Sequence, residues 1–143
     1  MAPRIEQLTE AEHQWIDAHL NVAKVFVATY SPEDANSPLT PAALDRAFSV
    51  WLLVGETDTE QINTIINAVG IAFGGFLLKQ GFAWVIASDE HGSEIAMLAL
   101  PGKGDVVIYP TNFVAKRWEQ KVDHFLEKAL TEIVERMSKL GAT

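Results

Sequence analysis

The stretch Ala68–Leu78, with the sequence AVGIAFGGFLL, decides the fold because three glycines interrupt an otherwise apolar run. Such a run can be a phosphate-binding turn, a membrane-crossing segment or a core helix that another element approaches closely. Gly70 and Gly74 are four residues apart, so in a helix they would share one face. We predict a core helix in which these two glycines form a notch for a neighbouring strand or helix.

The residues around this stretch disfavour the other two possibilities. Helical spacing of apolar residues begins behind Asp58 and Gln61, which are spaced as in a capping box. A phosphate-binding loop instead follows a strand and opens a helix, so the glycines lie too deep in the pattern. The apolar stretch from Ile65 to Leu78 contains Asn67 and falls short of the roughly 20 residues that span a bilayer.

Two helices are predicted before this one. Thr9 and Glu12 have the spacing of a capping box, and the apolar residues behind them recur at helical spacing until Tyr30. The pair Thr40-Pro41 starts a second helix, because proline is favoured at the first helical position behind a hydroxyl cap. Gly55 is a suitable residue to end it.

Behind Gly81 the period changes to that of β-strands. Residues 82–87, 94–100 and 105–109 are rich in apolar, β-branched and aromatic side chains. A loop at Asp89–Gly92 and a turn at Pro101–Gly104 connect them. Connections this short permit only antiparallel pairing, so we predict a three-stranded antiparallel meander.

The chain then returns to helical spacing. A short helix is predicted from Thr111, and Asp123 is a candidate cap for a last helix that ends near Leu140. We predict a single α+β domain over residues 1–143, with N-terminal helices, a three-stranded antiparallel meander and a C-terminal helix packed on the sheet.

Composition excludes several classes of function. The net charge is −8, which disfavours a nucleic-acid-binding protein and suits a soluble cytoplasmic protein, whose acidity serves either solubility alone or a basic protein partner. Charge is unevenly spread, because residues 1–100 carry 13 acidic and 4 basic side chains and residues 101–143 carry 6 and 7. The chain has no cysteine, so thiolate zinc sites are excluded. The four histidines have no metal-binding spacing, and we expect no metal or cofactor.

The first group of candidate binding residues is Asp89, Glu90 and His91 in the predicted hairpin loop. Two carboxylates beside an imidazole could transfer a proton, although solvated polar residues are also normal at a hairpin tip. No serine lies on a G-x-S-x-G elbow and no residue is assigned a catalytic role.

The second group is Lys116, Arg117 and Trp118, which contains the one pair of adjacent basic residues in the chain. These cations could hold an anion, or they could pair with carboxylates of another element while the tryptophan packs on the core.

Several of these segments, in this order, resemble a bacterial domain of unknown function numbered 3806. The resemblance covers residues from about Leu8 to Phe125 and rests on five short pieces. The pieces are VGIAFGG with Gly70 and Gly74, FAWV with Trp84, DEHG with Asp89, Glu90 and Gly92, YP with Pro110, and NFVAKR with Lys116 and Arg117. The resemblance implies a small bacterial α+β domain and carries over no catalytic residue.

Two hypotheses of function follow. In the first, the protein is a non-catalytic interaction module, in its sharper form an immunity or antitoxin-like protein that covers a basic partner with an acidic face. In the second, it is a small-molecule (anion) binding protein or an enzyme with a cleft near Lys116 and Arg117. If the hairpin tip folds back toward these residues, Asp89 and Glu90 would share that cleft.

Overall fold

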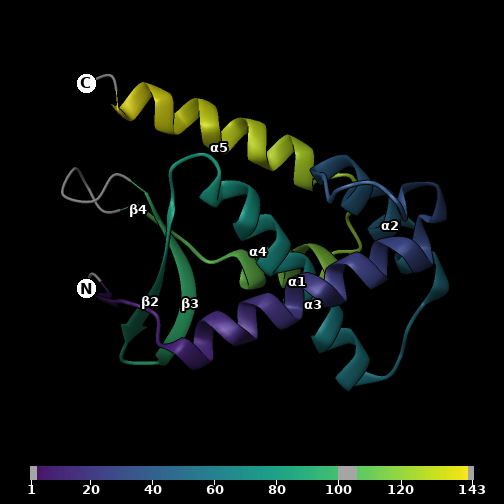
Figure 1. The fold of residues 1–143 in the computed structure, drawn as a ribbon, viewed down its shortest axis with the longest axis horizontal. Coiled ribbons are helices and arrows are strands. Elements are labelled where there is room, and N and C mark those ends of the chain that lie inside the picture. Colours follow the sequence, from purple (N-terminus) through teal and green to yellow (C-terminus); the bar gives the residue numbers. More distant parts are fainter. Residues whose placement is uncertain (1–2, 100–105, 142–143) are drawn as a thin grey trace.

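The computed structural model describes residues 3–99 and 106–141, which form an α+β fold (Figure 1). The elements in chain order are β1 (Arg4–Glu6), α1 (Glu10–Tyr30), a short 3-10 turn (Pro32–Asp34), α2 (Pro41–Val54), α3 (Thr59–Leu78), β2 (Ala83–Asp89), β3 (Gly92–Ala99), β4 (Val106–Ile108), α4 (Pro110–Glu119) and α5 (Leu126–Gly141). Figure 1 shows the sheet at one end of the molecule and the helices gathered on one side of it. The predicted fold class is therefore confirmed.

The sheet has four antiparallel strands in the order β1-β2-β3-β4. The predicted meander corresponds to β2, β3 and β4, whereas β1 was not predicted. This strand has only three residues and pairs Ile5 with Ala87, so its stability comes from its neighbour rather than from its own sequence. The turn predicted at Pro101–Gly104 lies outside the described residues.

The helix starts follow the sequence signals closely. The Thr9 N–H donates to Glu12 Oε1 at 2.7 Å and the Glu12 N–H donates to Thr9 Oγ1 at 3.3 Å, which completes the predicted capping box. Thr40 caps α2, and Gly55 ends it in the left-handed conformation with φ of 72°. Asp58 caps α3 by accepting the Glu60 N–H rather than through a capping box.

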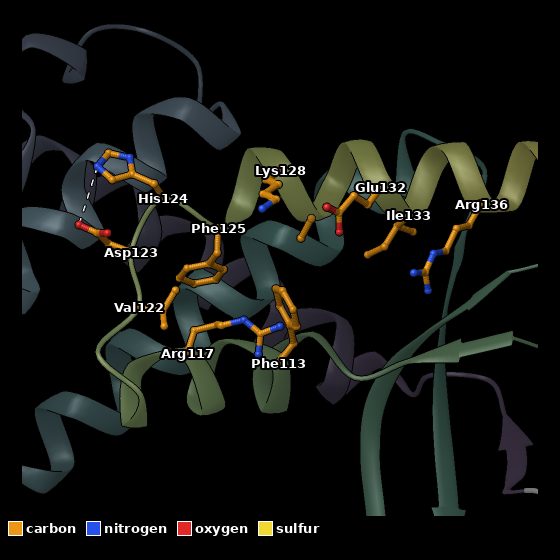
Figure 2. Close-up of a pocket in the computed structure, with 11 residues that line it drawn as sticks. Phe113, Arg117, Val122, Asp123, His124, Phe125, Lys128, Glu132, Ile133 and Arg136 are labelled. Carbon is orange, nitrogen blue, oxygen red and sulfur yellow. Dashed lines mark ion pairs between the residues drawn. The ribbon is translucent and has the colours of Figure 1, made fainter.

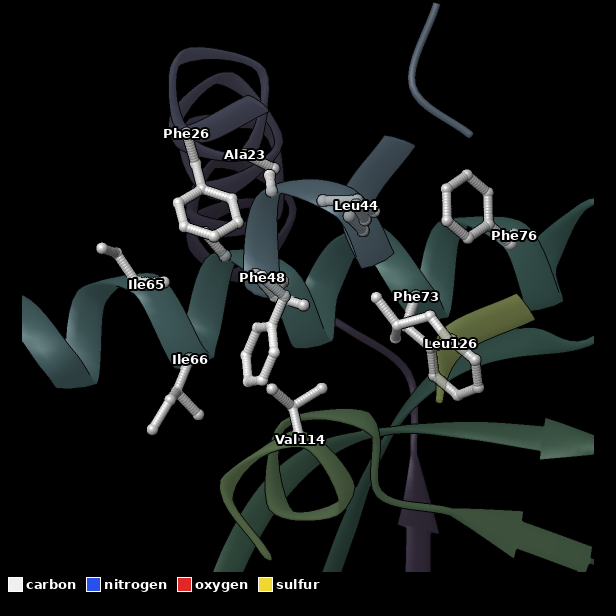
Figure 3. Close-up of a cluster of buried hydrophobic side chains, with 14 of the residues drawn as sticks. Ala23, Phe26, Leu44, Phe48, Ile65, Ile66, Phe73, Phe76, Val114 and Leu126 are labelled. Carbon is white, nitrogen blue, oxygen red and sulfur yellow. The ribbon is translucent and has the colours of Figure 1, made fainter. Parts of the chain in front are cut away.

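Helix α3 runs through the centre of the hydrophobic core (Figure 3). By length and composition alone its 20 residues could cross a membrane, but 67% of its apolar window is buried inside the protein. The length argument from the sequence counted only the apolar stretch from Ile65, whereas the whole helix begins at Thr59, where the helical spacing behind Asp58 predicts its start. Burial by its neighbours is what identifies α3 as a core helix.

The two predicted notch glycines each receive a different neighbour. A Cβ on Gly70 would lie 2.6 Å from Thr111 Cα, in the first turn of α4. A Cβ on Gly74 would overlap the ring of Trp84 on β2. The predicted notch is confirmed, and it accepts both a helix and a strand on one face of α3.

Replacing Gly74 by valine should lower the free energy of unfolding by about 2 kcal/mol or more, because the added methyl groups would displace the Trp84 ring. Urea denaturation followed by circular dichroism measures the change. A folded Gly74→Val variant with unchanged stability would show that the notch is empty.

The last helix packs mainly against other helices. We expected α5 on the sheet, but its main contacts are with α2 and α3, while α3 itself contacts β2 and β3. The predicted cap at Asp123 is also wrong, since its Oδ2 accepts a hydrogen bond from Ser49 Oγ at 2.7 Å. Asp45 of α2 caps α5 instead, and accepts the N–H groups of Leu126 at 2.8 Å and Glu127 at 3.1 Å.

Candidate functional site

The predicted tip residues lie in an exposed turn between β2 and β3. The His91 N–H donates to Asp89 Oδ1 at 2.8 Å, and His91 Nε2 lies 3.4 Å from Glu90 Oε1. The side chains of His91 and Glu90 are largely in solvent, with exposed fractions of 83% and 77%. Burial, and then the charges of Asp89 and Glu94, raise the pKa of Tyr109, the residue that follows β4. The tip is thus a turn closed by its own hydrogen bond, with its carboxylates in water.

The predicted basic segment lies on α4, where three consecutive residues point in different directions. The Arg117 guanidinium lies over the Phe113 ring, 4.4 Å from its centroid. Trp118 packs beside the buried Trp51 with ring centroids 6.5 Å apart, and Lys121 Nζ lies 4.0 Å from the Trp118 ring centroid. Lys116 is exposed. The three residues therefore do not form one patch.

The two predicted groups do not share a site through direct contacts. Within residues 3–99 and 106–141, no hydrogen bond, ion pair or ring contact joins the tip to Lys116, Arg117 or Trp118. Of the six predicted residues, Arg117 alone lines the groove described next.

This groove, the α4–α5 groove, lies between α4, the connection that follows it and α5 (Figure 2). Its volume is about 410 Å³. In Figure 2, Phe113 and Arg117 extend from α4 into the space below α5, and Arg136 extends into it from α5. The lining residues are Phe113, Arg117, Val122, Asp123, His124, Phe125, Lys128, Ala129, Glu132, Ile133 and Arg136.

Among the described residues, the cations of the α4–α5 groove lack ion-pair partners, whereas its carboxylate Asp123 has partners. The cations Arg117, Lys128 and Arg136 make no ion pair with a carboxylate in the described part of the chain. Asp123, by contrast, already accepts the Ser49 hydroxyl and lies 3.8 Å from His124 Nε2. The lining thus carries three cations without a carboxylate partner in the ranges that the structure describes, together with Asp123, which is already engaged, and Glu132, so cations outnumber carboxylates three to two and the groove is locally receptive to anions.

The connection between α4 and α5 fixes the shape of the groove. The Lys121 N–H donates to the Trp118 carbonyl at 3.0 Å and the Val122 N–H donates to the Arg117 carbonyl at 2.9 Å, which is the Schellman pattern. Lys121 and His124 have φ of 57° and 53°, a region that non-glycine residues rarely occupy. Such backbone strain persists only where surrounding structure enforces it, and it concentrates at functional sites.

Sequence reasoning found one of the three groove cations. Arg117 was found because it is next to another base, whereas Lys128 and Arg136 were absorbed into an amphipathic pattern. A usable signal did exist, since Lys128, Glu132 and Arg136 follow each other at four-residue steps and therefore share one face of α5. The concentration of bases after residue 100 is a second such signal.

Among the residues that the structure describes, no group of three or more histidine, cysteine, aspartate or glutamate side chains could hold a metal ion.

Comparison with known proteins identifies the family. The model of the domain of unknown function DUF3806 matches residues 52–128, which include α3, the strands β2 to β4, α4 and the start of α5. No curated protein and no solved structure matches the chain. The match includes the notch glycines of α3, the α4 wall of the groove and Lys128. The chain belongs to the DUF3806 family.

Proposed function

We propose that this protein is a binding module that holds an anionic ligand in the α4–α5 groove. The observation that carries the proposal is that Arg117, Lys128 and Arg136 line one groove and have no carboxylate partner in the described part of the chain. In a protein of net charge −8, carboxylates are abundant, so three unpaired cations in one groove favour a ligand from outside.

The groove offers an anion both charge and orientation. Stacking of Arg117 on Phe113 restricts the guanidinium, so less side-chain entropy is lost when its N–H groups bind a carboxylate or phosphate. Hydrogen bonds from a cation to an anion are roughly twice as strong as neutral ones. The apolar residues Phe125 and Ile133 line the same space and can receive the uncharged part of a ligand.

Binding without catalysis is the role that the groove chemistry favours. None of its lining residues carries a hydroxyl or thiol that could act as a nucleophile. In Figure 2 the His124 ring points away from Arg117 and toward Asp123. A bacterial, cytoplasmic setting belongs to the same proposal, and a chain without cysteine is compatible with a reducing compartment.

Calorimetric titration with citrate and with inorganic phosphate at low ionic strength tests the proposal. Arg117→Gln should weaken binding by at least about tenfold, because it removes a charge-assisted hydrogen bond. The matched control is Lys116→Gln, which makes the same charge change one residue away and outside the groove, and should weaken binding less than about twofold.

Two results would contradict this proposal. Equal losses in both variants would show that the anions respond to net charge and not to the groove. Absence of saturable binding to the unmodified protein for both anions would remove the proposed function itself.

A further inference from the structure

The length of the α4–α5 groove exceeds what one small anion can fill. Lys128 and Arg136 both line it and are eight residues apart on α5, a separation of about 12 Å along the helix axis. A single carboxylate or phosphate is only a few ångströms across, and in Figure 2 the Arg136 side chain lies well along α5 from Lys128. A ligand that uses the whole groove must carry two separated negative charges.

The middle of the groove disfavours a third negative charge. Glu132 lies four residues from Lys128 and four from Arg136, so its carboxylate stands between the two cations on the same helix face. In the described part of the chain Glu132 makes no ion pair. An anionic group placed at the centre would be repelled by this carboxylate.

An apolar group suits the centre instead. Ile133 lies on α5 between the two cations, and it lines the groove together with the Phe113 ring, which contacts the Phe125 ring with centroids 5.6 Å apart. Burial of an apolar side chain against these residues is favourable because it removes apolar surface from water. The groove thus has a cation at each end, Lys128 and Arg136. Between them it has an apolar surface next to the carboxylate of Glu132.

We infer that the ligand of the α4–α5 groove is an acidic peptide segment of a partner protein, bound in extended form. An extended chain advances about 3.3 Å per residue, so two acidic residues four positions apart span roughly 13 Å and reach both Lys128 and Arg136. The residue midway between them is apolar or aromatic. This inference rests on the proposed function and adds the ligand class and its charge pattern.

Fluorescence anisotropy with labelled peptides and the full chain tests this pattern. The patterned peptide carries two aspartates four positions apart with a phenylalanine midway, and its ends are capped. A second peptide has the same composition with the aspartates adjacent at the centre. The patterned peptide should bind at least about tenfold tighter than the rearranged one, because only its charges reach both cations while avoiding Glu132.

Variants of α5 separate the effects of Arg136 and Glu132 on peptide binding. Arg136→Gln should abolish the advantage of the patterned peptide, whereas Lys139→Gln, the same charge change on the same helix outside the groove, should leave it intact. Glu132→Gln should tighten binding of the rearranged peptide several-fold, and Glu135→Gln, which is also exposed and outside the groove, should not. Circular dichroism confirms that each variant is folded.

The outcomes distinguish this inference from the proposed function. If citrate binds through Arg117 but the patterned peptide has no advantage over the rearranged one, the peptide inference is overturned and the anion site stands. Preservation of the advantage in Arg136→Gln also overturns it. If neither citrate nor either peptide binds, both proposals fail.

Discussion

Replacing Gly70 by alanine should lower the free energy of unfolding by about 2 kcal/mol or more. The new Cβ would lie 2.6 Å from Thr111 Cα and 2.9 Å from Thr111 N, which are backbone atoms of α4. This clash could be relieved only if the start of α4 moved, but the buried residues Pro110 and Val114 hold it in place. Alanine improves the intrinsic helix propensity by about 1 kcal/mol, so the clash must exceed that gain.

Gly75→Ala is the matched control in the same helix. Its Cβ would meet Leu20 Cδ2 at 3.9 Å, an ordinary van der Waals contact. This variant should be unchanged or more stable by up to about 1 kcal/mol. Urea denaturation of both variants measures the difference, and equal effects at the two glycines would contradict the notch.

Replacing Asp45 by alanine should destabilise the protein by about 2–3 kcal/mol. Asp45 is only 5% exposed, and its carboxylate caps a helix that starts 81 residues later in the chain. Alanine would leave the N–H of the fully buried Leu126 without a partner. Asp45→Asn keeps one carbonyl acceptor and should lose about half as much.

Asp123→Ala is the control for this prediction, because the sequence alone favours Asp123 as the cap. The Asp123 side chain is 44% exposed and bonds to Ser49, so its removal should cost less than about 1 kcal/mol. Thermal and urea unfolding of the three variants rank the effects. A larger loss for Asp123→Ala than for Asp45→Ala would contradict the observed capping.

Interactions within one helix or hairpin were predictable from the sequence, whereas interactions between elements far apart in the chain were not. The Thr9 capping box and the Asp89–Gly92 turn depend on residues within a few positions of each other, and both were predicted. The Asp45 cap depends on how α2 lies against α5, which no local pattern encodes. The same limit explains why the three-residue strand β1 was missed.

The candidate site shows the same limit. Arg117 was predicted from its neighbour Lys116, but which of the two faces a groove depends on where α5 packs. Net charge predicted a basic partner, which stays a prediction, whereas the α4–α5 groove is locally positive and suits an acidic ligand. Composition describes the whole surface, and binding depends on the arrangement of a few side chains.

Arginine side-chain resonances test the central claim most directly. The chain has four arginines, of which Arg117 and Arg136 line the groove, while Arg4 and Arg46 pair with Glu6 and Asp34. Titration of ¹⁵N-labelled protein with citrate should shift the Nε–H signals of Arg117 or Arg136 to saturation and leave those of Arg4 and Arg46 unchanged. Uniform shifts of all four, or saturable shifts at Arg4 and Arg46 alone, would contradict an anion site in the α4–α5 groove.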